Sequence, residues 1–177
     1  RDNHRKIQMP REEYIGPDDI HENSEIFESL HLSKKTLIIT GHHTYDAGAK
    51  YVIENLEDND YEVDVKIIDD ATFEIVSEVE EHIDSETLVI GVGGGKIIDV
   101  AKYALFNKDV YFVSMPTTAS HDGIVSPLAS IKNPNRSTSV KANAPIALIG
   151  DSNIIADSPF RLLSAGCADI ISNFTAV

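Results

Sequence analysis

A glycine-rich turn between residues 87 and 105 constrains the fold more than any other stretch, and it reads TLVIGVGGGKIIDVAKYAL. A short apolar run leads into glycines at positions 91, 93, 94 and 95, and apolar residues then recur at the spacing of a helix. The pattern predicts a buried strand, a glycine turn and an amphipathic helix, which together make half of a βαβ unit. One glycine suffices for a tight turn, whereas three in a row cost backbone entropy. We therefore expect a phosphate site at the start of the helix, where free amide groups favour an anion.

Two familiar phosphate-binding loops do not match this turn. The Walker loop requires Ser or Thr after Gly-Lys, but Ile97 follows Lys96, and Ile90 stands where that loop needs its first glycine. The dinucleotide fingerprint requires a third glycine at the position of Lys96, and an acidic residue at the end of the next strand. The turn is therefore a phosphate loop of another kind.

Segments typical of strands and helices alternate along the chain. Strands are expected at residues 36–40, 63–67, 88–90, 110–115 and 146–149. Helices are expected where apolar residues follow helical spacing, at residues 20–30, 49–56, 73–83 and after the glycine turn. Thr72 is the expected N-cap of the third helix, and the turn-rich stretch NPNRS predicts a hairpin between residues 129–132 and 138–141. The alternation predicts an α/β fold with a largely parallel sheet and helices on both faces.

The pattern changes near the C-terminus, where strands give way to helices. Ser158 followed by Pro159 predicts the N-cap and the first residue of a helix. We therefore expect a domain boundary near Asp157, with residues 1–157 forming a nucleotide-binding domain and residues 158–177 beginning an all-α domain. The chain lacks an initiator Met and stops without a helix cap or polar tail, so we expect it to be a fragment.

Composition narrows the possible functions. The formal charge of −14 and the pI near 4.7 argue against a basic face, so we expect no nucleic-acid partner. No apolar run is long enough to cross a bilayer, so we expect no membrane insertion. The single cysteine, Cys167, excludes an internal disulfide and is compatible with a reducing cytosol, so the expected location is cytoplasmic.

A second polar loop, PTTASHDGIVSP at residues 116–127, follows one of the expected strands. Open parallel sheets bind ligands beyond the carboxyl ends of their strands, which is where both loops would lie. Asp122 contributes a carboxylate to this loop. The loop also carries hydroxyl groups that can donate to phosphate or ribose oxygens, those of Thr117, Thr118, Ser120 and Ser126. Each residue alone is more simply a turn-former, but their density after a strand favours a binding site.

Other polar residues leave alternatives open. Asp99 is expected in the first turn of its helix, where the helix dipole alone explains an acid. A carboxylate repels a diphosphate, so any ligand of Asp99 should be a sugar hydroxyl or the loop amides. Asp169 follows small residues near a helix start, and one acid is weak support for a metal because a catalytic zinc needs about three protein ligands. His42 and His43 are expected to be loop residues, and a proton relay through His121 is the less favoured interpretation.

Four motifs together resemble the archaeal sn-glycerol-1-phosphate dehydrogenase family, within the superfamily of glycerol dehydrogenase, iron-dependent alcohol dehydrogenase and dehydroquinate synthase. They are IQMPRE at residues 7–12, GVGGGKIID at 91–99, PTTASHDGIVSP at 116–127 and SAGCADIISNFTAV at 164–177. The resemblance covers essentially the whole chain. It implies a Rossmann-like NAD(P)-binding domain followed by the first turns of an all-α domain that binds metal and substrate.

The resemblance also implies roles for individual residues. Asp122 is expected to bind the substrate, and Asp169 to bind both the substrate and a zinc ion, so these two aspartates would carry catalysis. The other two zinc ligands of the family are histidines further along, and no histidine follows Asp169 here. The residues expected to line NAD or NADP are Gly93, Gly94, Gly95, Lys96, Ile97, Ile98, Asp99, Thr117, Thr118, Ala119, Ser120 and Ser126.

The implied reaction is the reduction of dihydroxyacetone phosphate to sn-glycerol 1-phosphate with NADH or NADPH, in a homo-oligomer. This step sets the glycerol stereochemistry of archaeal membrane lipids. The alternatives are a glycerol or butanol-type dehydrogenase, a dehydroquinate synthase-like lyase, and a nucleotide-binding module without catalysis if the natural protein ends at Val177. As a fragment, the chain alone is expected to be inactive.

Overall fold

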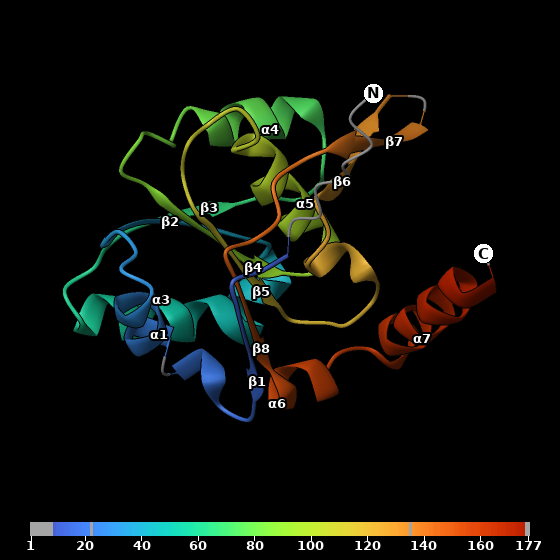
Figure 1. Ribbon diagram of the computed structural model, residues 1–177, viewed down its shortest axis with the longest axis horizontal. Helices are drawn as coiled ribbons and strands as arrows, with labels where there is room; N and C mark the ends of the chain where they lie inside the picture. The colour runs from blue at the N-terminus through green and yellow to red at the C-terminus, as the bar shows by residue number, and fades with distance from the viewer. Residues whose placement is uncertain (1–8, 22, 135, 176–177) are drawn as a thin grey trace, which may run out of the picture.

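The computed structural model describes residues 9–21, 23–134 and 136–175. Within them, parallel strands form one six-stranded sheet in the order β1-β8-β5-β4-β2-β3 (Figure 1). Its strands are β1 (Glu12–Gly16), β2 (Lys35–Thr40), β3 (Glu62–Ile67), β4 (Leu88–Gly93), β5 (Phe112–Pro116) and β8 (Ala147–Asp151). An antiparallel hairpin outside this sheet consists of β6 (Leu128–Asn133) and β7 (Arg136–Lys141). The prediction of an α/β fold around a largely parallel sheet is confirmed.

Helical segments connect the strands. The α-helices are α1 (Asn23–Ser29), α2 (His42–Thr44), α3 (Lys50–Asp58), α4 (Phe73–Glu80), α5 (Gly95–Ala104), α6 (Ser152–Ala156) and α7 (Phe160–Thr175). Two 3-10 segments are η1 (Asp19–His21) and η3 (Asp122–Ile124), and the π-helical turn η2 (Tyr45–Ala49) joins α2 directly to α3. The chain therefore stays helical from the end of β2 to the end of α3.

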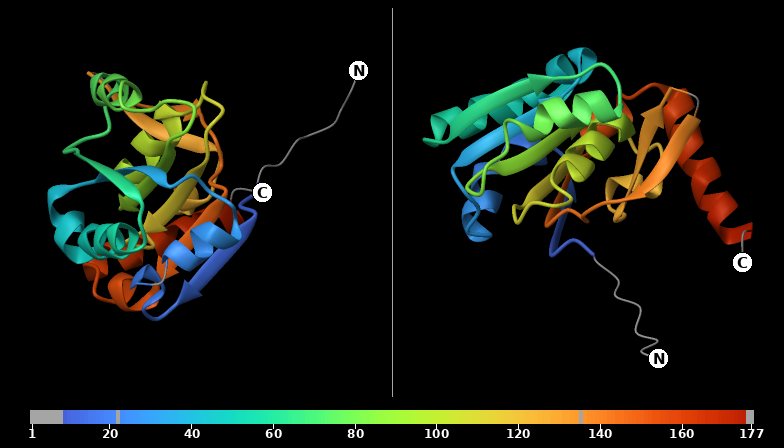
Figure 2. Two further views of the ribbon diagram at one scale, coloured as in Figure 1. Left: turned by 90° about the vertical axis from the view of Figure 1, so that its left-hand side faces the viewer. Right: turned by 90° about the horizontal axis from the view of Figure 1, so that it is seen from above.

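The helices cover both faces of the sheet, as predicted (Figures 1 and 2). Side chains alternate between the two faces along a strand, and β2 shows how this divides the core. Leu37 and Ile39 join the cluster beneath α4 and α5, whereas Ile38 joins the cluster beneath α1 and α3. Phe27 of α1 and Leu56 of α3 are fully buried in that second cluster. The sheet thus separates two apolar cores.

Burial along the sheet follows the position of each strand. Every residue of β4, β5 and β8 is buried, as expected for central parallel strands covered on both faces. The edge strands β1 and β3 expose Ile15, Val65 and Ile67. Pro116 is the last residue of β5 and not the residue after it.

Two local predictions are confirmed. Thr72 caps α4, because its hydroxyl accepts a hydrogen bond from the Ile75 N–H at 3.3 Å. The hairpin predicted around NPNRS is β6 and β7, and it packs against α5 by burying Ala129 and Ile131.

The prediction that Ser158 caps the last helix is wrong. Its backbone N–H closes the end of α6 by donating to the Ile155 carbonyl at 3.2 Å, and its buried hydroxyl has no partner among the described residues. Pro159 therefore precedes α7 and does not begin it. Helix α6 itself was not predicted. Its N-cap is Asp151, whose carboxylate accepts the first free amides of that helix.

Helix α7 extends away from the sheet (Figure 1). It leaves Phe160 82% exposed, and Ile170 and Ile171 are also largely exposed. None of the helices in the described part of the chain combines the length and the apolar character that a membrane crossing requires.

Candidate functional site

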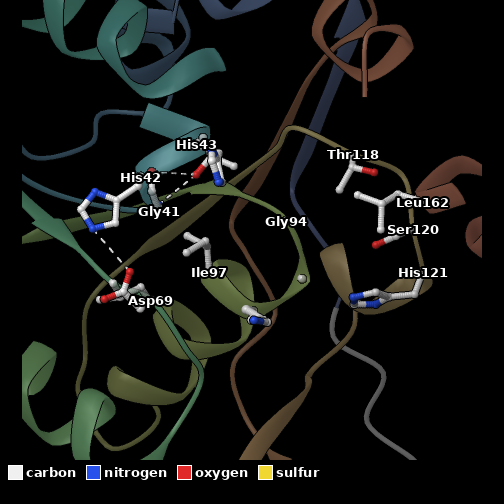
Figure 3. A pocket seen from close by; sticks show the side chains of 14 residues that line it. Gly41, His42, His43, Asp69, Gly94, Ile97, Thr118, Ser120, His121 and Leu162 are labelled. Atoms are coloured by element: carbon white, nitrogen blue, oxygen red, sulfur yellow. Dashed lines mark hydrogen bonds and ion pairs between the residues drawn. The ribbon is translucent and has the colours of Figure 1, made fainter. Parts of the chain in front are cut away.

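The carboxyl ends of β2, β4 and β5 meet at one edge of the sheet because these strands run parallel. The segments that follow them border one cleft of about 580 Å³ (Figure 3). Residues 41–44 at the start of α2 and residues 94–97 at the glycine turn form part of its wall. The polar loop contributes Thr118, Ser120 and His121, and α7 contributes Leu162. The structure therefore brings the two loops singled out from the sequence into one site.

The glycine turn presents free amides to this cleft. Gly94 is the N-cap of α5 in extended backbone with φ −80° and ψ −175°, which any residue adopts. A Cβ here would be in ordinary contact with the Thr118 methyl group at 3.4 Å, whereas a larger side chain would extend into the cleft. The amides of Gly95 and Lys96 have no backbone acceptor among the described residues. Free amides at the start of a helix favour an anion.

Thr118 offers an unpaired hydroxyl at the same place. The residue is 5% exposed, and its Oγ1 is buried without a hydrogen-bond partner in the described part of the chain. Such a group costs about 1–3 kcal/mol when it remains unpaired. The part of Thr118 nearest Gly94 is its methyl group, not this hydroxyl. Thr118 also borders a second lobe of about 460 Å³ beneath the start of α7, and Gly94 and Leu162 line both lobes.

His121 is held in one orientation beside the glycine turn. Its Nδ1 accepts a hydrogen bond from the Gly123 N–H at 2.8 Å, so the proton of the neutral imidazole is on Nε2. A Cβ on Gly95 would lie well under 3.0 Å from Nε2, which shows how closely the ring covers the start of α5. Figure 3 shows the ring pointing back toward the turn. His121 therefore adds a donor next to the free amides.

The prediction that His42 and His43 lie in a loop is wrong. Helix α2 begins at His42, two residues after the last residue of β2, and both histidines border the cleft from its first turn. The Thr44 hydroxyl makes this abrupt start possible by accepting the Gly41 N–H at 2.9 Å. His42 Nε2 also lies 3.4 Å from a carboxylate oxygen of Asp69, which follows β3. Apolar periodicity could not predict this helix, because its start depends on the polar side chain of Thr44.

The two aspartates expected to carry catalysis lie side by side. The Asp122 N–H donates to Asp169 Oδ2 at 3.0 Å, although the two residues are far apart in sequence. Helix α7 comes this close because Gly166 packs directly on the backbone of Ala119, where a Cβ would lie well under 3.0 Å from the carbonyl oxygen. Sequence reasoning missed Gly166. The available signal was a glycine three residues before Asp169, on the same face of the helix.

Asp99 lies deeper in the helix than predicted. Because α5 begins at Gly95, Asp99 is in the second turn, and its 8% exposed side chain forms an ion pair of 3.1 Å with the fully buried Lys102. Burial lowers the pKa of the Lys102 amine below its ordinary value of 10.5, while the negative charges of Asp99 and Asp122 oppose that shift. Lys102 was also missed from the sequence, where it stands out only as one lysine on an otherwise apolar helix face.

The other residues predicted to line a dinucleotide take different positions. Gly93 and Thr117 are buried at the ends of β4 and β5, and Thr117 borders the second lobe. Ile98 lies in the core beneath α5, and the Ser126 carbonyl accepts from Lys102 at 3.3 Å. In the part of the chain that the structure describes, no three His, Cys, Asp or Glu side chains gather as a metal site. Asp169 alone therefore does not make a complete site for a metal.

Comparison with known proteins gives a consistent set of relatives. The family described as iron-containing alcohol dehydrogenase matches residues 14–159. The chain is 68% identical over 175 residues to glycerol-1-phosphate dehydrogenase (NAD(P)+) of Methanobrevibacter smithii, covering 99% of this chain and 50% of the relative. It is 46% identical over 173 residues to the protein of the same name from Methanothermobacter thermautotrophicus, covering 98% and 50%. The chain thus spans about half the length of the curated relatives it matches.

The fold is also similar to that of glycerol dehydrogenase from Schizosaccharomyces pombe. The TM-score is 0.83 at 22% identity, over 97% of this chain and 45% of the other. The family match covers most of the chain and includes both loops that border the cleft. The chain therefore belongs to the iron-containing alcohol dehydrogenase family.

Proposed function

We propose that this chain is the nucleotide-binding half of an NAD(P)H-dependent enzyme that reduces dihydroxyacetone phosphate to sn-glycerol 1-phosphate. The observation that carries the proposal is the single cleft at which the glycine turn, the polar loop and the start of α7 meet. The 68% identity to a glycerol-1-phosphate dehydrogenase, which extends over both loops and the described part of α7, supports this choice of substrate. On this proposal residues 1–157 form the nucleotide domain, and residues 158–177 begin a second, helical domain.

The cleft suits the diphosphate of a dinucleotide. The Gly95 and Lys96 amides and the His121 Nε2–H all offer hydrogen bonds toward the same space. An anion rich in oxygen atoms satisfies all of them at once, and the positive end of the α5 dipole adds to its stabilisation. We propose that the dinucleotide lies against residues 93–99 and 117–120, and that it also contacts Ser126.

The substrate is proposed to lie where Asp122 and Asp169 meet. A bound nicotinamide would supply the hydride for the C2 carbonyl, and solvent would supply the proton for the oxygen. The protein's own contribution is to orient the reacting groups, with a carboxylate of this pair accepting the hydrogen bond of the substrate's one free hydroxyl. Ile97 and Leu162 supply apolar walls of the cleft that exclude water from it.

Asp169 is also proposed as one ligand of a zinc ion. Its carboxylate is a suitable oxygen ligand, but a catalytic zinc needs about three protein ligands, and the described residues do not supply them. We propose that the remaining ligands lie outside this chain, and we assign no step to the metal. The family's description names iron, so metal analysis of the whole protein decides between zinc and iron.

The cellular setting is part of the same proposal. We place the enzyme in the cytoplasm as a homo-oligomer that supplies the glycerophosphate backbone of archaeal membrane lipids. The strongly acidic composition and the single exposed cysteine are consistent with this setting.

The test is a substrate comparison with the whole protein. Absorbance of NADH or NADPH is followed with dihydroxyacetone phosphate, with unphosphorylated dihydroxyacetone and with butanal. We expect oxidation with the phosphorylated triose alone, and a product of the sn-1 configuration in an enantiomer-specific assay. Equal or faster oxidation with dihydroxyacetone would instead assign the protein as a polyol dehydrogenase.

A further inference from the structure

The side chain of Lys102 in α5 is fully buried, and the proposed reaction does not use its positive charge. Its Nζ donates to the carbonyl oxygens of Gly123 at 2.6 Å and Ser126 at 3.3 Å, and also to the carbonyl of Leu128. The Asp99 carboxylate lies 3.1 Å away and neutralises the ammonium. A charge removed from water persists only when it is paired and hydrogen-bonded, and Lys102 meets both conditions.

All three carbonyl groups belong to one short segment. It begins directly after Asp122 and ends at the first residue of β6, and it lacks regular structure beyond η3. A lysine ammonium is a compact charge with three donors, so it can hold converging carbonyls that an apolar side chain could not. These contacts fasten the segment to α5. Asp122 is then restrained from two sides, by this fastened segment and by its hydrogen bond to Asp169.

A second lysine of the same region provides a comparison. Lys108 also binds two backbone carbonyls, those of Glu80 at 2.9 Å and Ile83 at 2.8 Å, but these lie at the last residue of α4 and just after it. Lys108 remains partly exposed, and within the described part of the chain its amine donates to these two carbonyls and not to the polar loop. Carbonyl binding by a lysine is therefore not special to the site. What distinguishes Lys102 is that every carbonyl it binds lies in the segment that follows Asp122.

We propose that Lys102 is a positioning residue, which fixes residues 123–128 so that Asp122 stays against Asp169 at the cleft. The identity of the substrate in this inference rests on the proposed function, whereas the fixing of the segment does not. Two negative groups face the ammonium, Asp99 from its own helix and Asp122 from η3. Lys102 itself touches neither substrate nor dinucleotide.

The experiment compares Lys102→Met and Lys102→Arg with the control Lys108→Met in the whole protein. We expect Lys102→Met to raise the KM for dihydroxyacetone phosphate by about tenfold to a hundredfold, as a displaced binding group does. The Kd for NADPH should change less than this KM, since Ser126 is the one proposed dinucleotide contact in the fastened segment, and the glycine turn and residues 117–120 lie outside it. Amide hydrogen exchange in residues 122–128 should accelerate. Lys108→Met should leave both the KM and this exchange unchanged.

Lys102→Arg keeps the charge, but its planar fork cannot bring its donors to one point, so we expect intermediate values of KM and exchange. If Lys102→Met does not fold, the arginine variant decides: exchange equal to that of the unmodified protein would overturn the proposal. An unchanged KM in folded Lys102→Met, or an equal effect of Lys108→Met, would also overturn it. If the unmodified protein does not reduce the triose phosphate, the proposed function fails. Faster exchange in Lys102→Met alone would then still support the positioning role.

Discussion

Replacing Gly166 with alanine tests how α7 is placed against the polar loop. A Cβ at this position would lie well under 3.0 Å from the carbonyl oxygen of Ala119 and 3.0 Å from its carbonyl carbon. Both are backbone atoms, so no rotation of a side chain relieves the overlap. Helix α7 must then move away from the loop by about 1 Å, as overpacked sites generally do through backbone shifts.

The effects on stability and on activity differ in size. Alanine favours the helix by about 0.5–1 kcal/mol over glycine, whereas overpacking costs about 1–3 kcal/mol. The free energy of unfolding should therefore fall by no more than about 2.5 kcal/mol. Activity should fall further, because the shift separates Asp169 from the Asp122 N–H, which is now 3.0 Å from Oδ2. A misplacement of about 1 Å costs about a hundredfold in rate.

The assay is kcat/KM for dihydroxyacetone phosphate in the whole protein, together with the midpoint of thermal unfolding. We expect a loss of about a hundredfold in kcat/KM in a folded variant. Cys167→Ala, at the next and exposed position of α7, is the matched control and should leave kcat/KM unchanged. A folded Gly166→Ala variant with the kcat/KM of the unmodified protein would refute the close contact and its role.

Gly94→Val should weaken dinucleotide binding by at least about a hundredfold, or about 2.8 kcal/mol, because the branched side chain fills the cleft beside Thr118 while the extended backbone tolerates valine. Fluorescence titration measures this, and unchanged affinity would remove the turn from the site. Asp169→Asn should keep dinucleotide affinity, because its amide oxygen still accepts the Asp122 N–H. It should lose metal and activity together, because the amide carries no negative charge for the metal. Turnover at the normal rate would contradict the metal role. If the end of β2 faces the adenosine ribose, NADPH should be accepted alongside NADH, because Gly41 and His42 and not an acid follow that strand. His42→Asp should then selectively weaken NADPH by repelling its 2′-phosphate. A preference of the unmodified protein for NADH beyond about a hundredfold, about 2.8 kcal/mol, would contradict that assignment.

Local sequence patterns predicted the fold well because the signals were strong and near in sequence. Central strands such as Leu88–Gly93 are continuous apolar runs, and the helices between them show clear apolar periods. The same reasoning failed where polar capping decides the boundary. The side chain of Thr44 caps α2 just after β2, and that of Asp151 caps α6 at the end of β8. Neither short helix has a repeating pattern of apolar residues from which it could be predicted.

The candidate site divides in the same way. The glycine turn and the polar loop were recognisable because their residues are contiguous and follow strands. Lys102 and Gly166 were not, since their importance depends on contacts with residues more than twenty positions away. A lysine on an apolar helix face and a glycine inside a helix look like local exceptions in the sequence. Only the packing of α5 and α7 against the polar loop shows what they contact.

Amide NMR of the isotope-labelled protein titrated with NADPH tests the central claim most directly. If the diphosphate lies at the start of α5, the largest shifts should fall on residues 94–96 and 117–121, because the free amides, Thr118, Ser120 and His121 border the cleft. The cavity of about 440 Å³ at the amino ends of the strands, lined by Ser33, Thr87 and Tyr111 among others, should show no shifts. Shifts confined to that second cavity, with none at Gly94 to Lys96, would contradict the assignment of the cleft as the dinucleotide site.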